Sequence, residues 1–450
     1  MAEAPRLLKE TMSRCPVCHA AAPGRVFASA GKVFLQRTCE AHGEQTTCIS
    51  SDERFYHVSL GSRCETTGAE TGCCTPARGI NATPNTLEKL STCLALIEIV
   101  DSCNLACPTC FADSPTSKQV DCVSFEDFRQ RIDGVVARKG EIEILQLSGG
   151  EPTLHPEFFK LLEWAQNHAS IGYVLINTNG LRFAEDSFAR EFDASFRRGK
   201  VQLYLQYDGP HEQGQRTLRG ADLRQLRARV LEVTGAMADG GLPVTLAMTV
   251  TPDNLDSLWE TIEVGLGYSH VRGVSFQPMF HSGRLPAGAG APAPVRRLNT
   301  ADILIGAVEQ SAGRLRFEDF TPLPCGDPNC ATIGYLLKLP GGVRSISDLI
   351  DFSQLQAFLE QRVNYNLDDL ARCGCDSEPL GELLRRFELA PSATFRLFVK
   401  PFMDATTWDE DRIDRCCTHV IRPDGALDSF CRYYSGFPGT WNGPPEATPG

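Results

Sequence analysis

The chain has 450 residues, of which 42 % are hydrophobic and 22 % are charged, a balance typical of a globular protein with room for two or three domains. Its formal net charge of −12 argues against general affinity for nucleic acid, because a phosphate backbone attracts a basic surface, and we expect no nucleic-acid partner. No apolar run reaches the roughly 18 residues of a membrane span, and the first residues lack the apolar segment of a signal peptide, so we expect a cytoplasmic protein.

Cysteine is the unusual component, with 19 residues in the chain. Cytosolic proteins seldom keep structural disulfides, so clustered cysteines there more often bind metal or carry out redox chemistry. Cys93 and Cys122 stand apart near apolar residues, and we expect them to be small buried core residues. The clustered cysteines are expected to bind metal.

The first zone, residues 1–60, carries two short metal-binding patterns. Cys15 and Cys18 form C-x-x-C, and Cys39 and His42 form C-x-x-H. Together they predict a metal knuckle that holds zinc or a single rubredoxin-like iron, with buried thiols as the alternative. Cys48 is a further candidate ligand if iron is bound by thiolates only.

Residues 61–92 are rich in Gly, Thr and Ala and predict an irregular connection, which carries Cys64, Cys73 and Cys74. In residues 93–282 apolar strand patterns then alternate with helical patterns, one of which opens on Ser124 as its N-cap. This alternation predicts an α/β fold, a parallel sheet of six βα units in an open or partial barrel, with ligands at the carboxyl ends of the strands. The expected strands are 94–100, 142–148, 172–178, 201–207, 243–250 and 271–277, and the clearest helical patterns are 124–139, 155–169 and 223–238.

Three cysteines, Cys103, Cys107 and Cys110, directly follow the first expected strand. Three thiolates on one loop can hold three irons of a [4Fe–4S] cube. The fourth iron then keeps an open coordination position, through which a metal centre engages a substrate or cofactor. A structural zinc is the alternative, and its fourth ligand would come from elsewhere.

Polar and glycine residues also follow the later strands, at the same edge of the expected sheet. Glycines let the backbone approach a ligand closely, and a carboxylate such as Glu151 can accept a bond from an ammonium group. For the side chains after the third and fourth strands, a turn with capping side chains is the alternative. The candidate residues are Gly149, Gly150, Glu151 and Pro152 after the second strand, Asn177, Thr178 and Asn179 after the third, and Gln206 and Asp208 after the fourth.

The C-x-x-x-C-x-x-C loop, the "GGEP" at 149–152 and the aromatic Phe111 after the last cysteine resemble the radical S-adenosylmethionine (SAM) superfamily. The resemblance implies a partial (β/α)6 TIM-like barrel, a [4Fe–4S] cluster on Cys103, Cys107 and Cys110, and SAM bound at the open iron. It also implies that "GGEP" binds the SAM amino group and that the polar residues of the third and fourth strands reach SAM or substrate. In this family one electron, here expected from a flavodoxin- or ferredoxin-like donor, cleaves SAM to a 5′-deoxyadenosyl radical that removes hydrogen from an unactivated C–H bond.

The last zone, residues 283–435, carries further cysteines, and residues 436–450 predict a disordered tail. Four of five cysteines would suffice for an auxiliary [4Fe–4S] cluster, with one of an adjacent pair spare. Cys373 and Cys375 could add to that set or serve another site. The five candidates are Cys325, Cys330, Cys416, Cys417 and Cys431.

The order of motifs along nearly the whole chain resembles one branch of the superfamily, which contains tetraether lipid synthases and pterin methyltransferases. One departure is the segment before the barrel, where "RCETTGAETGCCTPARGI" replaces the branch's "GCPxDCGLC"-like pattern and puts a cluster on Cys64, Cys73, Cys74 and Cys93 in doubt. We expect carbon–carbon bond formation on a lipid chain, with peripheral membrane contact. The alternatives are radical methylation or alkylation of a pterin-like molecule, a peptide maturase, and a non-catalytic metal-binding adaptor.

Overall fold

The structure, a computed structural model, describes residues 4–58, 92–117, 120–285, 297–322, 327, 329–339, 341–345, 348 and 393–436. Cys64, Cys73, Cys74, Cys325, Cys373 and Cys375 lie outside these residues, as do most of the connection at 61–92 and the tail after 436. Within the described residues, no helix has the length and apolar character that crossing a membrane requires.

The N-terminal unit is an antiparallel sheet of four strands within residues 4–58, in the order β1-β2-β3-β4. Its small apolar core holds Val26, Val33, Leu35 and Tyr56. The turns after β1 and after β3 carry the two metal-binding patterns, so both lie at one end of this sheet. The elements are β1 (Arg6–Arg14), β2 (Ala21–Ser29), β3 (Lys32–Cys39), β4 (Gly43–Ser50) and α1 (Glu53–Val58).

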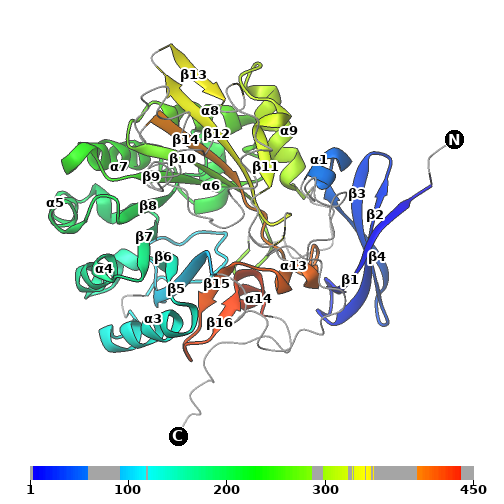
Figure 1. Ribbon diagram of the computed structural model, residues 1–450, viewed down its shortest axis with the longest axis horizontal. Coiled ribbons are helices and arrows are strands. Elements are labelled where there is room, and N and C mark those ends of the chain that lie inside the picture. The colour runs from blue at the N-terminus through cyan, green and yellow to red at the C-terminus, as the bar shows by residue number, and fades with distance from the viewer. Residues whose placement is uncertain are drawn as a thin grey trace, which may run out of the picture.

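The six expected strands are confirmed as β5 to β10, and each pairs in parallel with the next along the chain. Helices lie on the outer side of this sheet (Figure 1). Ser124 caps the first of them and accepts a hydrogen bond from the Asp127 amide at 3.2 Å. The strands are β5 (Leu94–Val100), β6 (Ile142–Gly149), β7 (Ile171–Thr178), β8 (Val201–Gln206), β9 (Val244–Val250) and β10 (Val271–Pro278), and the helices are α3 (Phe125–Lys139), α4 (Phe158–Asn167), α5 (Asp186–Ser195), α6 (Glu212–Arg219), α7 (Arg224–Ala236) and α8 (Leu258–Leu266).

The C-terminal part of the chain adds strands to both sides of the same sheet. β14 (Thr394–Val399) pairs in parallel with β10, and β15 (Thr418–Ile421) pairs in parallel with β5. Antiparallel strands follow at each edge, so the described part of the sheet is open and mostly parallel. The α/β fold class is confirmed, and the division of the chain at residue 282 stays a prediction. The remaining elements are β11 (Phe320–Pro322), β12 (Thr332–Leu339), β13 (Gly342–Ser345), β16 (Leu427–Ser429), α9 (Thr300–Gln310), α13 (Glu410–Asp414) and α14 (Phe430–Ser435), with 3-10 turns at Pro152–Leu154, Arg182–Ala184, Ala238–Gly240, Leu255–Ser257 and Phe317–Asp319.

The two faces of the sheet differ in chemistry because strand side chains alternate between them. On the outer face, aliphatic residues such as Leu145, Leu147, Leu203 and Leu205 are fully buried in the core beneath the helices. The alternate positions face inward and are largely polar. The inner face is therefore the side on which a ligand can be bound.

The N-terminal sheet packs against the segment that follows β14 (Figure 1). Arg37 is 1 % exposed and donates hydrogen bonds to the carbonyls of Thr406 at 2.5 Å and Ala405 at 3.3 Å. Lys9 forms an ion pair with Asp409, its Nζ 2.6 Å from the carboxylate. The N-terminal unit is thus joined to the segment that leads to Cys416 and Cys417.

Candidate active site

One cavity at the carboxyl ends of the parallel strands gathers most of the expected site residues. It extends along the inner face of the sheet to Cys416 and Cys417, which directly precede β15 and lie beside the amino end of β5, because Thr418 pairs with Leu94. Pro152 does not line the cavity and begins the 3-10 turn behind Glu151. The expected residues that line it are Cys103, Cys107, Cys110, Phe111, Gly149, Gly150, Glu151, Asn177, Thr178, Asn179, Gln206, Asp208, Cys330, Cys416, Cys417 and Cys431.

The cysteine loop between β5 and α3 is held by backbone hydrogen bonds. The Cys103 amide donates to the Pro115 carbonyl at 2.9 Å, and Cys110 and Arg284 exchange two backbone bonds of 2.9 Å each. Burial raises the pKa of Cys103 to about 12 and also raises that of Cys107. Thiols in such surroundings ionise only where a cation compensates the charge, which suits metal ligands better than free nucleophiles.

Gly149 and Gly150 allow a close approach between two backbone segments. A Cβ at Gly149 would lie 2.0 Å from the Val100 carbonyl oxygen, and one at Gly150 would lie 2.1 Å from that of Ser102. The Gly150 amide donates to the Val100 carbonyl at 2.8 Å. The segment that these glycines admit is therefore the start of the cysteine loop itself.

Glu151 joins the ends of β6 and β7. Its carboxylate is 1 % exposed and accepts hydrogen bonds from the hydroxyls of Thr153 at 2.6 Å and Thr178 at 2.7 Å, and from the Asn179 amide at 2.8 Å. Burial raises the pKa of this carboxyl, although the bonds it accepts act in the opposite direction. The Asn179 side chain in turn donates to Asn104 at 2.7 Å and lies 3.7 Å from the Cys103 sulfur. The expected polar residues are thus linked to the cysteine loop, and their contacts with SAM stay predictions.

Arg219 is a site residue that the sequence analysis missed. It donates to both carboxylate oxygens of Asp208, from Nε at 2.6 Å and from a terminal nitrogen at 2.9 Å. The same guanidinium lies 3.5 Å from the Thr109 carbonyl oxygen, within the cysteine loop. Asp208, expected to reach SAM or substrate, therefore orients Arg219 against the loop. No motif marks this pair, because the two residues stand eleven positions apart on different elements.

Arg227 was missed as well, and it fixes two of the expected residues. It donates to the Asn179 carbonyl and, at 3.1 Å, to the side-chain oxygen of Gln206. Phe111 packs in an aromatic cluster, with ring centroids 4.8 Å from Tyr434 and 5.5 Å from Phe430. That cluster lies between the cysteine loop and the C-terminal cysteines, because Phe430 precedes Cys431.

The described C-terminal cysteines approach the cavity from three segments. The Met403 amide donates to the Cys431 sulfur at 3.3 Å, and Arg412 lies 3.6 Å from the Cys330 sulfur. Burial raises the pKa of Cys431 to about 11 and also raises the pKa of Cys416 well above its ordinary value. These buried thiols beside a guanidinium fit metal ligands, and an auxiliary cluster on them stays a prediction.

The two isolated cysteines differ from each other. Cys93 is buried as expected, and it lines the cavity beside Cys417, to whose carbonyl its amide donates at 3.0 Å. Cys122 is exposed, so its expected place in the core is wrong. Its backbone forms an isolated β-bridge with Val100 at the end of β5, and its side chain is exposed to solvent.

The metal-binding patterns of the N-terminal sheet meet at one point. The ligand atoms of Cys15, Cys18, Cys39 and His42 all lie within 4.8 Å of one another, with three separations of 3.6, 3.6 and 3.7 Å. Zinc bonds of about 2.3 Å to sulfur and about 2.0 Å to nitrogen at tetrahedral angles give ligand separations of this size. Burial opposes ionisation of Cys15, yet the backbone amides of Cys18 and Val17 lower its pKa to about 6. Cys48 lies on β4 and is not part of this ligand set.

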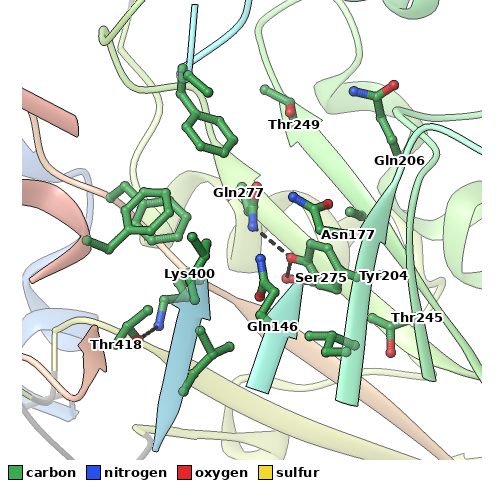
Figure 2. A pocket seen from close by; sticks show the side chains of 18 of the residues that line it. Gln146, Asn177, Tyr204, Gln206, Thr245, Thr249, Ser275, Gln277, Lys400 and Thr418 are labelled. Atoms are coloured by element: carbon green, nitrogen blue, oxygen red, sulfur yellow. Dashed lines mark hydrogen bonds between the residues drawn. The ribbon is translucent and has the colours of Figure 1, made fainter. Parts of the chain in front are cut away.

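The inner face of the sheet carries a set of polar side chains (Figure 2). Asn177 and Gln206 were expected from the sequence, and the other members of the set were missed. They occupy alternate positions within the strands, as Tyr204 and Gln206 do in β8 and Ser275 and Gln277 do in β10. This period of two was the available signal, because polar residues at alternate positions of a buried strand face a cavity or a solvated side. The polar residues in Figure 2 are Gln146, Asn177, Tyr204, Gln206, Thr245, Thr249, Ser275, Gln277, Lys400 and Thr418.

The sequence profile of the radical SAM superfamily matches residues 97–264, which span β5 to α8 and hold the cysteine loop. Residues 97–264 therefore form a radical SAM domain. The superfamily implies a [4Fe–4S] cluster and SAM, and the cavity offers three cysteines on one loop with linked polar residues around them. A second profile, described as the HMPTM N-terminal zinc ribbon domain, matches residues 7–51 and covers the four metal-ligand candidates.

Two relatives differ in how much of the chain they match. The 7,8-dihydro-6-hydroxymethylpterin dimethyltransferase of Methanocaldococcus jannaschii is 24 % identical over 94 % of this chain and 93 % of its own. The mycofactocin maturase MftC of Mycobacterium tuberculosis is 25 % identical over 34 % of this chain and 37 % of its own. Among solved structures, SuiB of Streptococcus suis bound to S-adenosylmethionine aligns with 47 % of this chain and 44 % of its own, at 14 % identity and a TM-score of 0.35.

Proposed function

We propose that this radical SAM enzyme methylates or otherwise alkylates a pterin-like small molecule, with the alkyl group supplied by a second molecule of SAM and the electrons by the reductant. The observation that supports it is the match to the pterin dimethyltransferase over 94 % of the chain, a span that must include most of residues 7–51 and of residues 97–264. The expectation of lipid carbon–carbon coupling has less support than this alternative. Peptide maturation also has less support than pterin alkylation, because the mycofactocin maturases match only between 34 % and 38 % of the chain.

The polar side chains of the strands that line one side of the cavity favour a polar substrate over an alkyl chain. Amide and hydroxyl groups face inward from several neighbouring strands, including Gln146, Asn177 and Gln277. A methylene chain offers these groups no hydrogen bonds, and each buried polar group left without a partner costs about 1–3 kcal/mol. A heterocycle with polar edge atoms removes that penalty.

Each part of the cavity has a defined task in this proposal. When bound, a [4Fe–4S] cluster with SAM would supply the means to remove a hydrogen atom from a substrate carbon, given one electron from a flavodoxin- or ferredoxin-like donor. Cys103, Cys107 and Cys110 hold the cluster, and Arg219 braces their loop through the Thr109 carbonyl. The burial of Glu151 and its neighbours excludes water from the side on which SAM is expected.

The remaining metal sites are proposed in supporting roles. Zinc in the site of Cys15, Cys18, Cys39 and His42 would stabilise the N-terminal sheet, whose apolar core is small. An auxiliary [4Fe–4S] cluster would be held by cysteines of the 330–431 region. Its place on the same cavity suits electron transfer to or from a substrate radical.

The proposal is tested with anaerobically reconstituted protein, SAM, a reductant and 6-hydroxymethyl-7,8-dihydropterin, with a second reaction that contains a membrane lipid instead. Mass spectrometry of pterin, lipid and 5′-deoxyadenosine gives the result. We expect an alkylated pterin and an unchanged lipid. A coupled or otherwise modified lipid with an unchanged pterin contradicts the proposal.

The matched controls are two alanine variants. The Cys103→Ala, Cys107→Ala, Cys110→Ala triple variant should form neither product nor 5′-deoxyadenosine, because no cluster would then be held on the loop. Cys122→Ala removes an exposed cysteine outside the cavity and should behave as the wild-type protein does.

A further inference from the structure

We propose that five side chains on the inner face of the sheet recognise the hydrogen-bonding edge of a flat, neutral heterocycle. We call them the polar floor: Gln146, Asn177, Tyr204, Ser275 and Gln277. The inference rests on the proposed function and adds to it the residues that select the substrate. An aromatic wall, formed by Phe111, Phe280, Phe402 and Phe430 in the same cavity, would pack against the face of the ring.

The polar floor is held in place by its own hydrogen bonds. Gln277 donates from its side-chain nitrogen to the Tyr204 hydroxyl at 2.7 Å, and Tyr204 donates to the Ser275 hydroxyl at 2.7 Å (Figure 2). Asn177 stands directly beside Tyr204 in the register of β7 and β8. Rigid groups of this kind lose little conformational freedom on binding, which favours affinity and selectivity.

The floor still has hydrogen-bonding capacity to offer. Gln146 is 9 % exposed, lines the cavity, and its carboxamide has no hydrogen-bond partner among the described residues. Gln277 uses its amide nitrogen for Tyr204 and Asn177 uses its own for Ser148 at 3.3 Å, so each can turn a side-chain oxygen to a ligand. Buried amides are rarely left unpaired, and a ligand edge with both donors and acceptors would pair these.

The charge of the floor indicates a neutral ligand. Its five members are amides and hydroxyls, and burial raises the pKa of Tyr204 to about 12, so that its hydroxyl stays protonated at neutral pH. Among the cations that line the cavity, Arg219 is paired with Asp208, and Lys400 donates to the Thr418 hydroxyl at 2.6 Å. An uncharged ring with an amide-like edge, such as a pterin or a guanine, fits the floor better than a phosphate or a carboxylate.

The aromatic wall complements this edge. Phe402 and Phe430 stack with centroids 4.1 Å apart, and Phe280 lies 5.3 Å from Phe402. Phe111 joins the wall at 5.5 Å from Phe430 and follows the cysteine loop directly. A planar ring can stack on such a surface while its edge bonds to amides. The ring would then lie beside the cysteine loop, where a C–H bond can meet the radical.

The test measures binding by equilibrium dialysis of the anaerobically reconstituted holoprotein in the presence of SAM. The probes are 6-hydroxymethyl-7,8-dihydropterin, its N3-methyl derivative, in which the edge N–H is blocked, and guanine. The variants are Gln146→Met and Gln277→Met, with Gln225→Met on the exposed side of α7 as the matched control. Iron content and thermal melting report whether each variant is folded.

We expect the wild-type protein to bind the dihydropterin. Methylation of the probe at N3 should weaken binding about 10-fold, and so should each of the substitutions Gln146→Met and Gln277→Met. Each change removes a buried hydrogen bond, which is worth about 1–2 kcal/mol. Gln225→Met should bind as the wild type does. Unchanged binding by folded Gln146→Met and Gln277→Met overturns the inference and leaves the proposed function standing. Binding of guanine without dihydropterin overturns the proposed function alone, and binding of no probe overturns both.

Discussion

The buried ion pair between Asp208 and Arg219 can be broken by Asp208→Asn with little change in shape. Asp208 has a φ of +62°, a conformation that Asn also tolerates, so the substitution adds no backbone strain. The carboxylate accepts two bonds from Arg219, of 2.6 and 2.9 Å, and the amide can accept only one of them. Removing one partner of a buried pair costs about 3–5 kcal/mol, and we take about 3 kcal/mol because one bond survives.

The loss of this ion pair should destabilise the cysteine loop, because Arg219 contacts the loop at the Thr109 carbonyl. We expect amide hydrogen exchange of residues 103–110 to accelerate about 100-fold, since 1.4 kcal/mol corresponds to a factor of ten. Exchange is followed by mass spectrometry on the reconstituted protein. Asp222→Asn is the control, because its pair with Arg224 is exposed to solvent and should leave the loop unchanged. Exchange in the Asp208→Asn loop at the wild-type rate would refute this role of the pair.

Two further predictions concern how the site is supported. Gly150→Ala places a Cβ 2.1 Å from the Ser102 carbonyl oxygen and should lower the iron retained after reconstitution. The control Gly134→Ala places a Cβ 3.4 Å from the flexible side chain of Arg138 and should retain the iron. Equal iron in the two proteins would contradict the prediction. Arg37→Met leaves two carbonyls of the 405–406 segment without a donor and should accelerate amide hydrogen exchange there about 10-fold or more. The control Arg25→Met, on the exposed face of the same sheet, should leave the exchange rate of this segment unchanged. Matching exchange rates in the two variants would mean that Arg37 does not hold the segment.

The sequence predicted the central part of the fold well, because periodicity and capping are local. All six parallel strands appear at their expected places, and Ser124 caps its helix. The cysteine loop and the segment of Glu151 meet at the carboxyl ends of neighbouring strands, as a parallel sheet requires. Such features depend on residues that are close in the chain or on a topology that the alternation already implies.

Contacts between distant segments could not be predicted in the same way. β14 and β15 flank the six central strands, although long stretches of chain separate them from β10 and β5. The pairing of Asp208 with Arg219 depends on how α6 returns to the sheet, which no local pattern records. Unlike these long-range contacts, the inward-facing polar residues had a local signal in the sequence, which is their alternation in β8 and β10. The apolar residues of the same strands made this alternation hard to recognise.

The central claim, radical chemistry on a pterin-like substrate, is tested most directly by following one hydrogen atom. The reconstituted enzyme is given SAM, a reductant and 6-hydroxymethyl-7,8-dihydropterin deuterated at its ring and side-chain carbons, and 5′-deoxyadenosine is examined by mass spectrometry. We predict deuterium in 5′-deoxyadenosine together with alkylated pterin. Formation of 5′-deoxyadenosine without deuterium, while the pterin is recovered unchanged, would contradict the claim.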